Sequence, residues 1–209
     1  MIDKFRDTNI MLKDRYDELA KHYNERLHIH IPNHKKVLEP FINLVKTNFS
    51  NPKVFDLGCG VGLNSLILEQ NGFNVTGLDY SDKCLNHAKL NCPQSKFVHA
   101  DFLDWNPNEK FHGIVAGSFL DRFHPDLLPE LFNKIDSLLV PKGYGLTYMS
   151  VSKDDDNLGI PIKCSTVNPY TALVARDTWL QKLSENFKVV NYYEGYGCRD
   201  WFISIFQKH

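Results

Sequence analysis

The segment VFDLGCGVGLN, residues 54–64, decides the fold class of this chain. An apolar run containing Asp56 is followed by three glycines that alternate over five residues, at positions 58, 60 and 62. Glycine loses more backbone entropy on folding than any other residue, so it is a poor choice unless a side chain must be absent. A loop that leaves a strand and brings its bare main chain close to a ligand has that requirement. The segment therefore predicts a strand, a ligand-binding loop and the start of a helix.

Short apolar runs alternate with helical patterns along the rest of the chain. This alternation is typical of α/β proteins in which a mostly parallel sheet carries helices on both faces. Only eight residues separate the last two runs, so we expect an antiparallel hairpin at one edge. The predicted strands are Lys53–Leu57, Asn74–Leu78, Lys96–His99, Gly113–Ala116, Tyr144–Met149, Phe187–Tyr192 and Trp201–Phe206. The predicted helices are Leu12–Asn24, Asn33–Asn48, Leu63–Asn71, Asp82–Asn91 after a capping Ser81, Asp126–Leu139 and Asp177–Asn186.

Length and composition limit the number of domains and the kinds of partner. The 209 residues fit one domain, and a formal net charge of -1 gives no electrostatic support for a nucleic-acid partner. Five cysteines without a CxxC pair argue against a disulfide framework or a thiolate zinc site. The N-terminus is charged, and no apolar run approaches the ~18 residues of a membrane span. We therefore expect a cytoplasmic protein without membrane or nucleic-acid partners.

The single domain is expected to have three parts. Residues 1–50 form an N-terminal helical lid, residues 51–150 a cofactor-binding half, and residues 151–209 a substrate loop and C-terminal hairpin. The first helix carries an apolar face that includes Tyr16 and Tyr23, which either covers a ligand or only packs on the domain. The segment Val151–Val174 is too long for a simple connection, and long loops commonly cover binding sites.

Three acidic residues lie at or near the ends of successive predicted strands. A fixed carboxylate at Asp56 repels a pyrophosphate and attracts a ligand that carries an ammonium group. Asp79 is expected to accept hydrogen bonds from ribose hydroxyls, as in other doubly wound folds. Asp101 is expected to accept from an adenine amine beside the apolar wall of Phe102. One nucleoside with a positively charged group satisfies all three acids.

Four segments resemble successive motifs of class I S-adenosylmethionine-dependent methyltransferases: VFDLGCGVG, GLDYS, HADFLDW and LLVPKGYGLTYM. The resemblance spans roughly residues 53–150. It implies a Rossmann-like three-layer sandwich with a doubly wound sheet of seven strands, ordered 3-2-1-4-5-7-6 with strand 7 antiparallel. The chain departs from the family pattern at Gly113, where the fourth strand usually begins with Asp, and at Pro141-Lys142-Gly143, which replaces a Pro-Gly-Gly turn.

The resemblance also implies the cofactor, S-adenosylmethionine, and transfer of its methyl group to a small-molecule acceptor by in-line displacement. The glycine loop is implied to hold the methionine part, Asp79 the ribose and Asp101 the adenine. Tyr16 is implied to reach the cofactor from the helix that contains YDELAKHY. The implied cofactor-binding residues are Tyr16, Asp56, Gly58, Cys59, Gly60, Asp79, Tyr80, Asp101, Phe102 and Gly117.

The loop after the fourth strand, GSFLDRFH at residues 117–124, borders the transferring methyl group in this fold and holds the candidate catalytic residues. A histidine such as His124 can accept a proton near neutral pH, and Asp121 is placed to bind or orient a cationic acceptor. Histidines at this position also commonly only pack or cap the next helix. Because a sulfonium methyl is already activated, alignment and exclusion of water matter more than acid–base groups.

Other functions remain open beside methyl transfer. A nicotinamide-dependent oxidoreductase uses GxGxxG, but Leu63 occupies the last glycine position here. A scaffold that binds the cofactor without turnover fits the same motifs, and the oligomeric state is either monomer or homodimer. No metal is expected, because no carboxylate or cysteine completes a ligand set around His28, His30 and His34, which lie in a predicted connecting loop.

Overall fold

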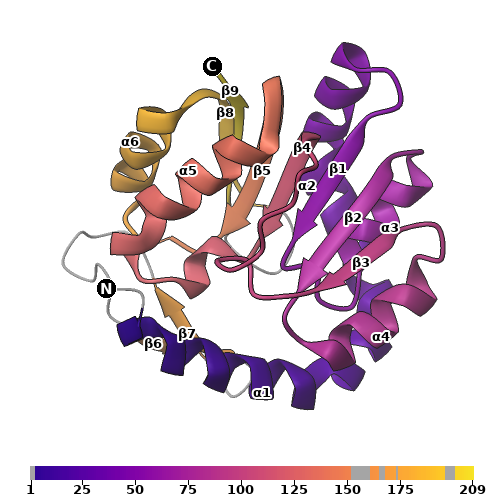
Figure 1. Cartoon of the computed structure of the whole chain (residues 1–209), viewed down its shortest axis with the longest axis vertical. Coiled ribbons are helices and arrows are strands. Elements are labelled where there is room, and N and C mark those ends of the chain that lie inside the picture. Colours follow the sequence, from indigo (N-terminus) through magenta and orange to yellow (C-terminus); the bar gives the residue numbers. More distant parts are fainter. Residues whose placement is uncertain (1–2, 152–160, 165–167, 173, 196–200) are drawn as a thin grey trace.

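A seven-stranded sheet forms the centre of the molecule (Figure 1). The computed structural model describes the backbone of residues 3–151, 161–164, 168–172, 174–195 and 201–209, and the side chains of 13–151, 174–195 and 201–209. The strand order is β3-β2-β1-β4-β5-β9-β8, which confirms the expected order, and β9 runs antiparallel to β5 and β8. Its strands are β1 (Lys53–Leu57), β2 (Asn74–Asp79), β3 (Lys96–His99), β4 (Phe111–Gly117), β5 (Leu139–Met149), β8 (Phe187–Glu194) and β9 (Phe202–Lys208).

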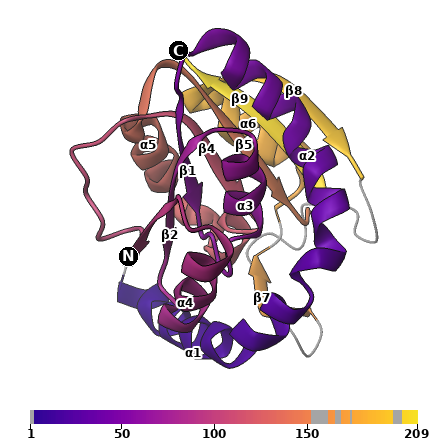
Figure 2. The same cartoon turned by 90° about the vertical axis from the view of Figure 1, so that its right-hand side faces the viewer.

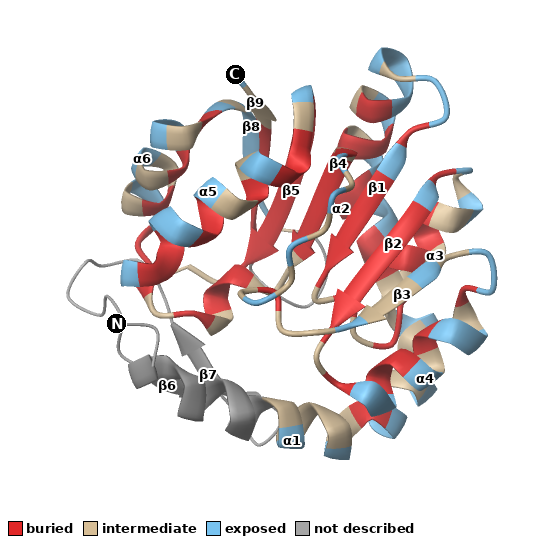
Figure 3. Cartoon of the chain, in the orientation of Figure 1, coloured by how far each residue is buried: buried red, intermediate tan, exposed pale blue. Residues whose placement is uncertain are grey.

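Helices cover both faces of the sheet, as Figure 2 shows from the side. The α-helices are α1 (Asp3–Glu25), α2 (Leu27–Asn48), α3 (Leu63–Gln70), α4 (Asp82–Asn91), α5 (Leu128–Leu138) and α6 (Arg176–Asn186). Successive strand residues point to opposite faces. Val54 therefore packs in a core with α2 and α3, whereas Phe55 packs in a second core with α5 and α6. Figure 3 shows the resulting buried centre of the sheet.

Local signals explain most of the element boundaries. The predicted helix Asp82–Asn91 is confirmed, and the Ser81 hydroxyl accepts a hydrogen bond from Cys84 N at 3.1 Å as its N-cap. At Gly113, a Cβ atom would lie 2.6 Å from the Phe41 ring of α2. The aspartate that the family usually carries there has no room in this chain, because α2 packs directly on β4.

The prediction for the second helix was wrong at its start. It begins at Leu27 rather than Asn33, so His28 and His30 lie on the same helix as His34 and not in a connecting loop. Pro32 lies inside this helix, at a position where it removes one main-chain N–H donor.

Two other boundaries also differ. The helix expected over Asp126–Leu139 is divided into the 3-10 helix η2 (Pro125–Leu127) and α5, while a second 3-10 helix, η1 (Leu120–Arg122), precedes them. Strand β5 begins at Leu139 and includes the expected turn, with Lys142 in the left-handed region at φ +62°. The chain therefore passes from α5 into β5 without an intervening loop.

Part of the Val151–Val174 segment, expected to cover the acceptor, forms the two-stranded sheet β6 (Pro161–Cys164) and β7 (Asn168–Ala172). The remainder from 152 to 173 lies outside the described residues, and so does 196–200. Helix α1 crosses the end of the main sheet to which the parallel strands point (Figures 1 and 2). In the described helices there is no stretch long and apolar enough to span a membrane.

Candidate active site

A cavity of about 250 Å³ lies at the carboxyl ends of the central strands. Parallel α/β sheets bind their ligands at this edge, because the loops that leave the strands converge there. The lining combines α1, α2, the glycine loop and the ends of β2, β3, β4 and β5. The expected cofactor residues in this lining are Tyr16, Gly58, Cys59, Gly60, Asp79, Tyr80, Asp101, Phe102 and Gly117. The fold thus brings together all the residues expected around the cofactor except Asp56.

The first two glycines of the loop are required for different reasons. Gly58 has φ +69°, and a Cβ atom built on it would lie 2.4 Å from the Phe119 ring. Gly60 has φ +53°, and nothing lies within 4 Å of its Cβ position. Left-handed backbone favours glycine at both positions. Gly58 in addition makes room for a side chain of the loop after β4, whereas Gly60 presents bare main chain at the cavity.

The third glycine packs against a different element from the one expected. A Cβ atom on Gly62 would lie 3.2 Å from Ala88 and 3.1 Å from Cys92 Sγ, both of which belong to α4 or its end. A glycine at the start of the helix that follows such a loop is expected to let the helix lie close to the strand, here α3 on β1. The absent side chain instead allows α4 to approach the loop, and the Cys92 thiol donates a hydrogen bond to Gly62 O at 3.4 Å.

Asp79, at the end of β2, is fixed by main-chain donors. Its Oδ2 accepts a hydrogen bond from Gly60 N at 2.8 Å, and its Oδ1 accepts one from Ser81 N at 2.9 Å. Burial raises the pKa of the Asp79 carboxyl to about 6, although these hydrogen bonds favour its charged form. The contact with Gly60 ties the acid to the glycine loop and sets the orientation of the carboxylate at the cavity wall.

Asp101 and Phe102 follow β3 along the same wall. The Asp101 Oδ1 accepts a hydrogen bond from Leu103 N at 2.9 Å, which fixes this carboxylate in the same way as that of Asp79. Phe102 is buried, and its ring meets that of Phe119 edge to face at a centroid distance of 5.9 Å. Together they place a hydrogen-bond acceptor next to an apolar wall.

The structure places Asp56 beneath the loop and outside the cavity lining. The side chain is fully buried, and its Oδ2 accepts a hydrogen bond from the Ser65 hydroxyl at 2.7 Å. Burial raises the pKa of the Asp56 carboxyl to about 6. The expected direct contact with a cationic ligand is therefore replaced by support of the start of α3. Asp56 lies within β1, and this part of the chain reaches the cavity lining only from Gly58 onward.

The two residues proposed as catalytic also lie outside the lining. His124 is the N-cap of η2, where its Nδ1 accepts a hydrogen bond from Asp126 N at 3.3 Å. Asp121 is buried, with its Oδ1 3.7 Å from Arg122 Nε. Arg122, which lies between them in sequence, does line the cavity. Asp121 and Arg122 are successive residues of the 3-10 turn η1, which rotates successive side chains by about a third of a turn, so the two point in different directions.

Helix α1 closes the cavity on the side of α4 and contributes Tyr16 and Tyr23 to the lining. The Asp17 carboxylate accepts hydrogen bonds from the Ser81 hydroxyl and, at 3.3 Å, from Lys83 N. Burial raises the pKa of the Tyr16 hydroxyl above its usual value, so this group stays protonated at neutral pH. The docked helix thus adds neutral phenol groups to the cavity.

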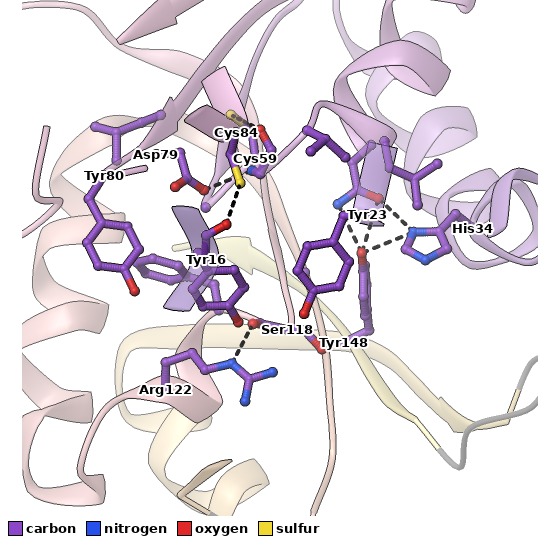
Figure 4. Close-up of a pocket in the computed structure, with 18 of the residues that line it drawn as sticks. Tyr16, Tyr23, His34, Cys59, Asp79, Tyr80, Cys84, Ser118, Arg122 and Tyr148 are labelled. Carbon is purple, nitrogen blue, oxygen red and sulfur yellow. Dashed lines mark hydrogen bonds between the residues drawn. The ribbon is translucent and has the colours of Figure 1, made fainter. Parts of the chain in front are cut away.

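A polar cluster that sequence reasoning missed lies on the opposite side of the cavity (Figure 4). It consists of His34 from α2, Asn64 from α3 and Tyr148 from β5. The Asn64 Oδ1 lies 3.0 Å from His34 Nδ1, and the Tyr148 hydroxyl lies 3.1 Å from the same nitrogen. Trp201 packs on both rings, at centroid distances of 5.1 Å from His34 and 4.7 Å from Tyr148. No local motif predicts this cluster, because its members are far apart in the sequence.

Comparison with known proteins supports the class suggested by the motifs. Residues 54–143 match the methyltransferase domain family. Magnesium protoporphyrin IX methyltransferase (ChlM) from Synechocystis PCC 6803, solved with bound SAM, has the same fold, with a TM-score of 0.74 and 14% identity over 97% of both chains. The resemblance to class I S-adenosylmethionine-dependent methyltransferases is therefore confirmed over residues 54–143, which match this domain family and lie within the shared fold.

Curated relatives share part of this domain. Trans-aconitate 2-methyltransferase of Escherichia coli O1:K1 / APEC is 37% identical over 92 residues, which are 43% of this chain and 36% of that protein. The enzyme of the same name from Escherichia coli O139:H28 (strain E24377A / ETEC) is 33% identical over 125 residues, 58% of this chain and 48% of that protein. The matched segments thus span less than half the length of these relatives.

Proposed function

We propose that this protein transfers the methyl group of S-adenosylmethionine to a small-molecule acceptor. The observation that carries the proposal is the wall formed by Gly60, Asp79 and Asp101, which places bare main chain and two fixed acids around one cavity. A ribose needs hydrogen-bond acceptors for its hydroxyls, and an adenine amine needs another. The residues present fit the cofactor, since the cavity offers both acceptors beside the apolar wall of Phe102.

The proposed roles follow from these positions. Asp79 accepts hydrogen bonds from the ribose hydroxyls, Asp101 accepts from the adenine amine, and Gly58 and Gly60 border the methionine part. Tyr16 covers the cofactor from α1. Asp56 supports the loop from below without contact.

The transfer is proposed to be an in-line displacement that the protein assists by alignment. When bound, S-adenosylmethionine supplies an activated methyl group on a sulfonium. The aromatic side chains of Tyr16, Tyr23, Phe119 and Phe123 line the cavity and exclude water from it. No proton transfer is assigned to His124 or Asp121, because their side chains do not reach the lining.

Calorimetry and product analysis test this function separately from its alternatives. S-adenosylmethionine and S-adenosylhomocysteine are each titrated into the protein, with NADH as the control for an oxidoreductase. The protein is then incubated with methyl-labelled cofactor and trans-aconitate or a metabolite extract, and labelled products are detected by mass. Binding of the adenosyl compounds and a labelled small molecule are expected. Binding with no labelled product would indicate a scaffold, and binding of NADH alone would indicate an oxidoreductase.

A further inference from the structure

The residue that follows β4, Ser118, has a main-chain conformation that serine rarely adopts. Its φ is +49°, in the left-handed region, where residues other than glycine and asparagine are uncommon. Ser118 lines the cavity and is half-buried. Glycine would be the unstrained choice at such a position, so the presence of a side chain there needs a reason. Strained main chain clusters at functional sites, where the surrounding structure holds it in place.

Hydrogen bonds on both sides of Ser118 hold this conformation. Ser118 N donates a hydrogen bond to Tyr148 O at 2.7 Å, which extends the pairing of β4 with β5 by one residue. Ser118 O accepts a hydrogen bond from Arg122 Nε at 3.3 Å, as Figure 4 shows. Both main-chain groups are therefore occupied. In the described part of the chain the Ser118 hydroxyl makes no hydrogen bond to another residue, so it is the polar group that Ser118 can offer to a ligand.

Ser118 lies where the two sides of the cavity meet. Its neighbour Gly117 pairs with Tyr148 of the polar cluster, and a side chain on Gly117 would collide with the Tyr148 ring. Its other neighbour, Phe119, packs over Gly58, which the proposed function assigns to the methionine part of the cofactor. The methyl group to be transferred belongs to that part. Ser118 is thus placed between the reacting end of the proposed cofactor and the side of the cavity left for the acceptor.

We propose that the Ser118 hydroxyl orients the methyl acceptor by accepting a hydrogen bond from an O–H or N–H group on the atom that receives the methyl. The proposal rests on the proposed methyltransferase function, and it names the substrate class as small molecules with a nucleophilic hydroxyl or amino group. A serine oxygen has two lone pairs with which to accept. When Ser118 holds the proton of the acceptor atom, a lone pair of that atom can be aligned with the methyl carbon. Carbon nucleophiles lack such a donor and thiols donate weakly, so neither would use this contact.

The proposed step needs no residue that takes up a proton. A lone pair of the acceptor oxygen or neutral nitrogen forms the bond to the methyl carbon, while the carbon–sulfur bond breaks and leaves its electron pair on sulfur. The positive charge passes to the methylated atom. An oxygen loses this charge by releasing its proton to water, whereas a nitrogen can keep it as an ammonium group. The Ser118 hydroxyl is unchanged at the end of the step.

Substitution of Ser118 by glycine separates this role from a structural one. Ser118→Gly removes the hydroxyl but relieves the strained main chain. Lys142→Gly is the matched control, since Lys142 has φ +62°, is exposed and lies outside the cavity lining. Both variants should keep or raise the melting temperature, by up to about 4 °C. Methyl-labelled S-adenosylmethionine and a metabolite extract are the probes, and the labelled product is analysed by mass and carbon NMR. The acceptor identified in this way is then used in pure form for kinetics.

The expected product carries its labelled methyl group on oxygen or nitrogen. Ser118→Gly and Ser118→Ala should lower kcat/KM for the acceptor about 3- to 10-fold, as expected for the loss of one neutral hydrogen bond. Lys142→Gly should leave kcat/KM unchanged. All three variants should bind S-adenosylhomocysteine with wild-type affinity, because the hydroxyl is assigned to the acceptor.

Three results would overturn the proposal and leave the proposed function standing. One is a labelled methyl group on sulfur or carbon. The second is wild-type kcat/KM in Ser118→Gly and Ser118→Ala, which would make the strained conformation incidental. The third is an equal loss of S-adenosylhomocysteine affinity in these variants, which would assign the hydroxyl to the cofactor. Uptake of S-adenosylhomocysteine by the wild type with no labelled product would instead indicate a scaffold, which contradicts the proposed function and this proposal with it.

Discussion

The two walls of the cavity are built in different ways. The acidic wall is held by main-chain donors. Ser81 N and Leu103 N lie only two residues from the acids that they bind, Asp79 and Asp101, and Gly60 N adds a second bond to Asp79. The opposite wall joins residues from distant parts of the sequence through side-chain contacts between His34, Asn64, Tyr148 and Trp201. The first wall thus depends mainly on the local geometry at the strand ends. The second exists only after α2, α3 and β5 have packed together.

This difference separates general binding from specificity. A wall made by strand ends and main-chain donors can recur in any chain with the same fold, because it depends on few side chains. A wall made by tertiary contacts changes whenever one packing partner changes. We therefore expect the acidic wall to set the cofactor and the opposite wall to set the acceptor. The following predictions test this division.

The largest expected effect is on the acidic wall. Asp79→Ala removes the proposed acceptor of two ribose hydrogen bonds, each worth about 1.5 kcal/mol or more with a charged partner, so affinity for S-adenosylhomocysteine should fall about 100-fold or more. Calorimetry measures the loss. Asp101→Ala should cost about 10-fold, since one hydrogen bond is involved. Retention of wild-type affinity by Asp79→Ala would remove this acid from the site.

The two loop glycines provide a matched pair for stability. Gly58→Ala forces a Cβ atom against Phe119 in left-handed backbone, which should lower the free energy of unfolding by about 3 kcal/mol. Gly60→Ala adds only the backbone strain, about 1 kcal/mol. Urea denaturation compares them. Cofactor affinity should show the reverse order among molecules that remain folded, with the larger loss in Gly60→Ala. The open space at the Gly60 Cβ position faces the cavity, so a methyl group there would meet the cofactor, whereas a methyl group on Gly58 meets Phe119. Equal stabilities would contradict the close contact with Phe119.

The opposite wall should affect stability without affecting the cofactor. Tyr148→Phe removes a hydroxyl that contacts both His34 and Asn64 in a buried setting. The free energy of unfolding should fall by about 1–2 kcal/mol, because buried polar partners lose a hydrogen bond. Affinity for S-adenosylhomocysteine should stay within about twofold, less than the ~1 kcal/mol of a single hydrogen bond. Tyr192→Phe is the control, since Tyr192 is exposed. A large loss of cofactor affinity in Tyr148→Phe would contradict the proposal that the two walls of the cavity serve different ligands.

The smallest expected effect concerns pH and Asp56. The folded-state pKa of this carboxyl is about 6, above its usual value of 3.8, so the folded state binds its proton more tightly. Its contribution to stability is then fully present below about pH 4 and declines as the pH rises through 6. Between pH 5 and 7 this decline amounts to about 1 kcal/mol. Denaturation curves of Asp56→Asn, measured over the same pH range, should lack this decline. A variant whose stability depends on pH as that of the wild type does would contradict the raised pKa of Asp56.

Sequence reasoning reached the acidic wall because its signals are local. The glycine alternation, Asp79 and Asp101 each mark a strand end, and the strand order followed from the resemblance carried by the same motifs. Asp56 shows the limit of this reasoning. The sequence shows that Asp56 lies two residues before Gly58. Whether its side chain faces the ligand depends on how the strand, the loop and the helix α3 are oriented relative to one another.

The opposite wall could not be predicted in the same way. Nothing in the segment HIHIPNH indicates that His34 faces Asn64 and Tyr148, because the contact requires α2 to lie on β5. The loop after β4 was located correctly as part of the site. His124 and Asp121, expected from this loop, lie outside the cavity lining, whereas Arg122 lies in it, and the 3-10 turn η1 that sets the direction of Asp121 and Arg122 had no signal in the sequence.

The way in which α1 is attached bears on how ligands would enter and leave the cavity. This helix borders the cavity, and the apolar contacts of its described side chains, residues 13–25, belong to a small cluster around Ala20, Val61 and Cys84, apart from both main cores. The same part of the helix is also held by polar contacts, from Asp17 to the start of α4 and from Asn24 to Asn91. A local detachment of α1 would open the cavity and leave the sheet and its two cores packed. Small molecules would then enter and leave without global unfolding, as in proteins whose binding-site cover is less stable than the core.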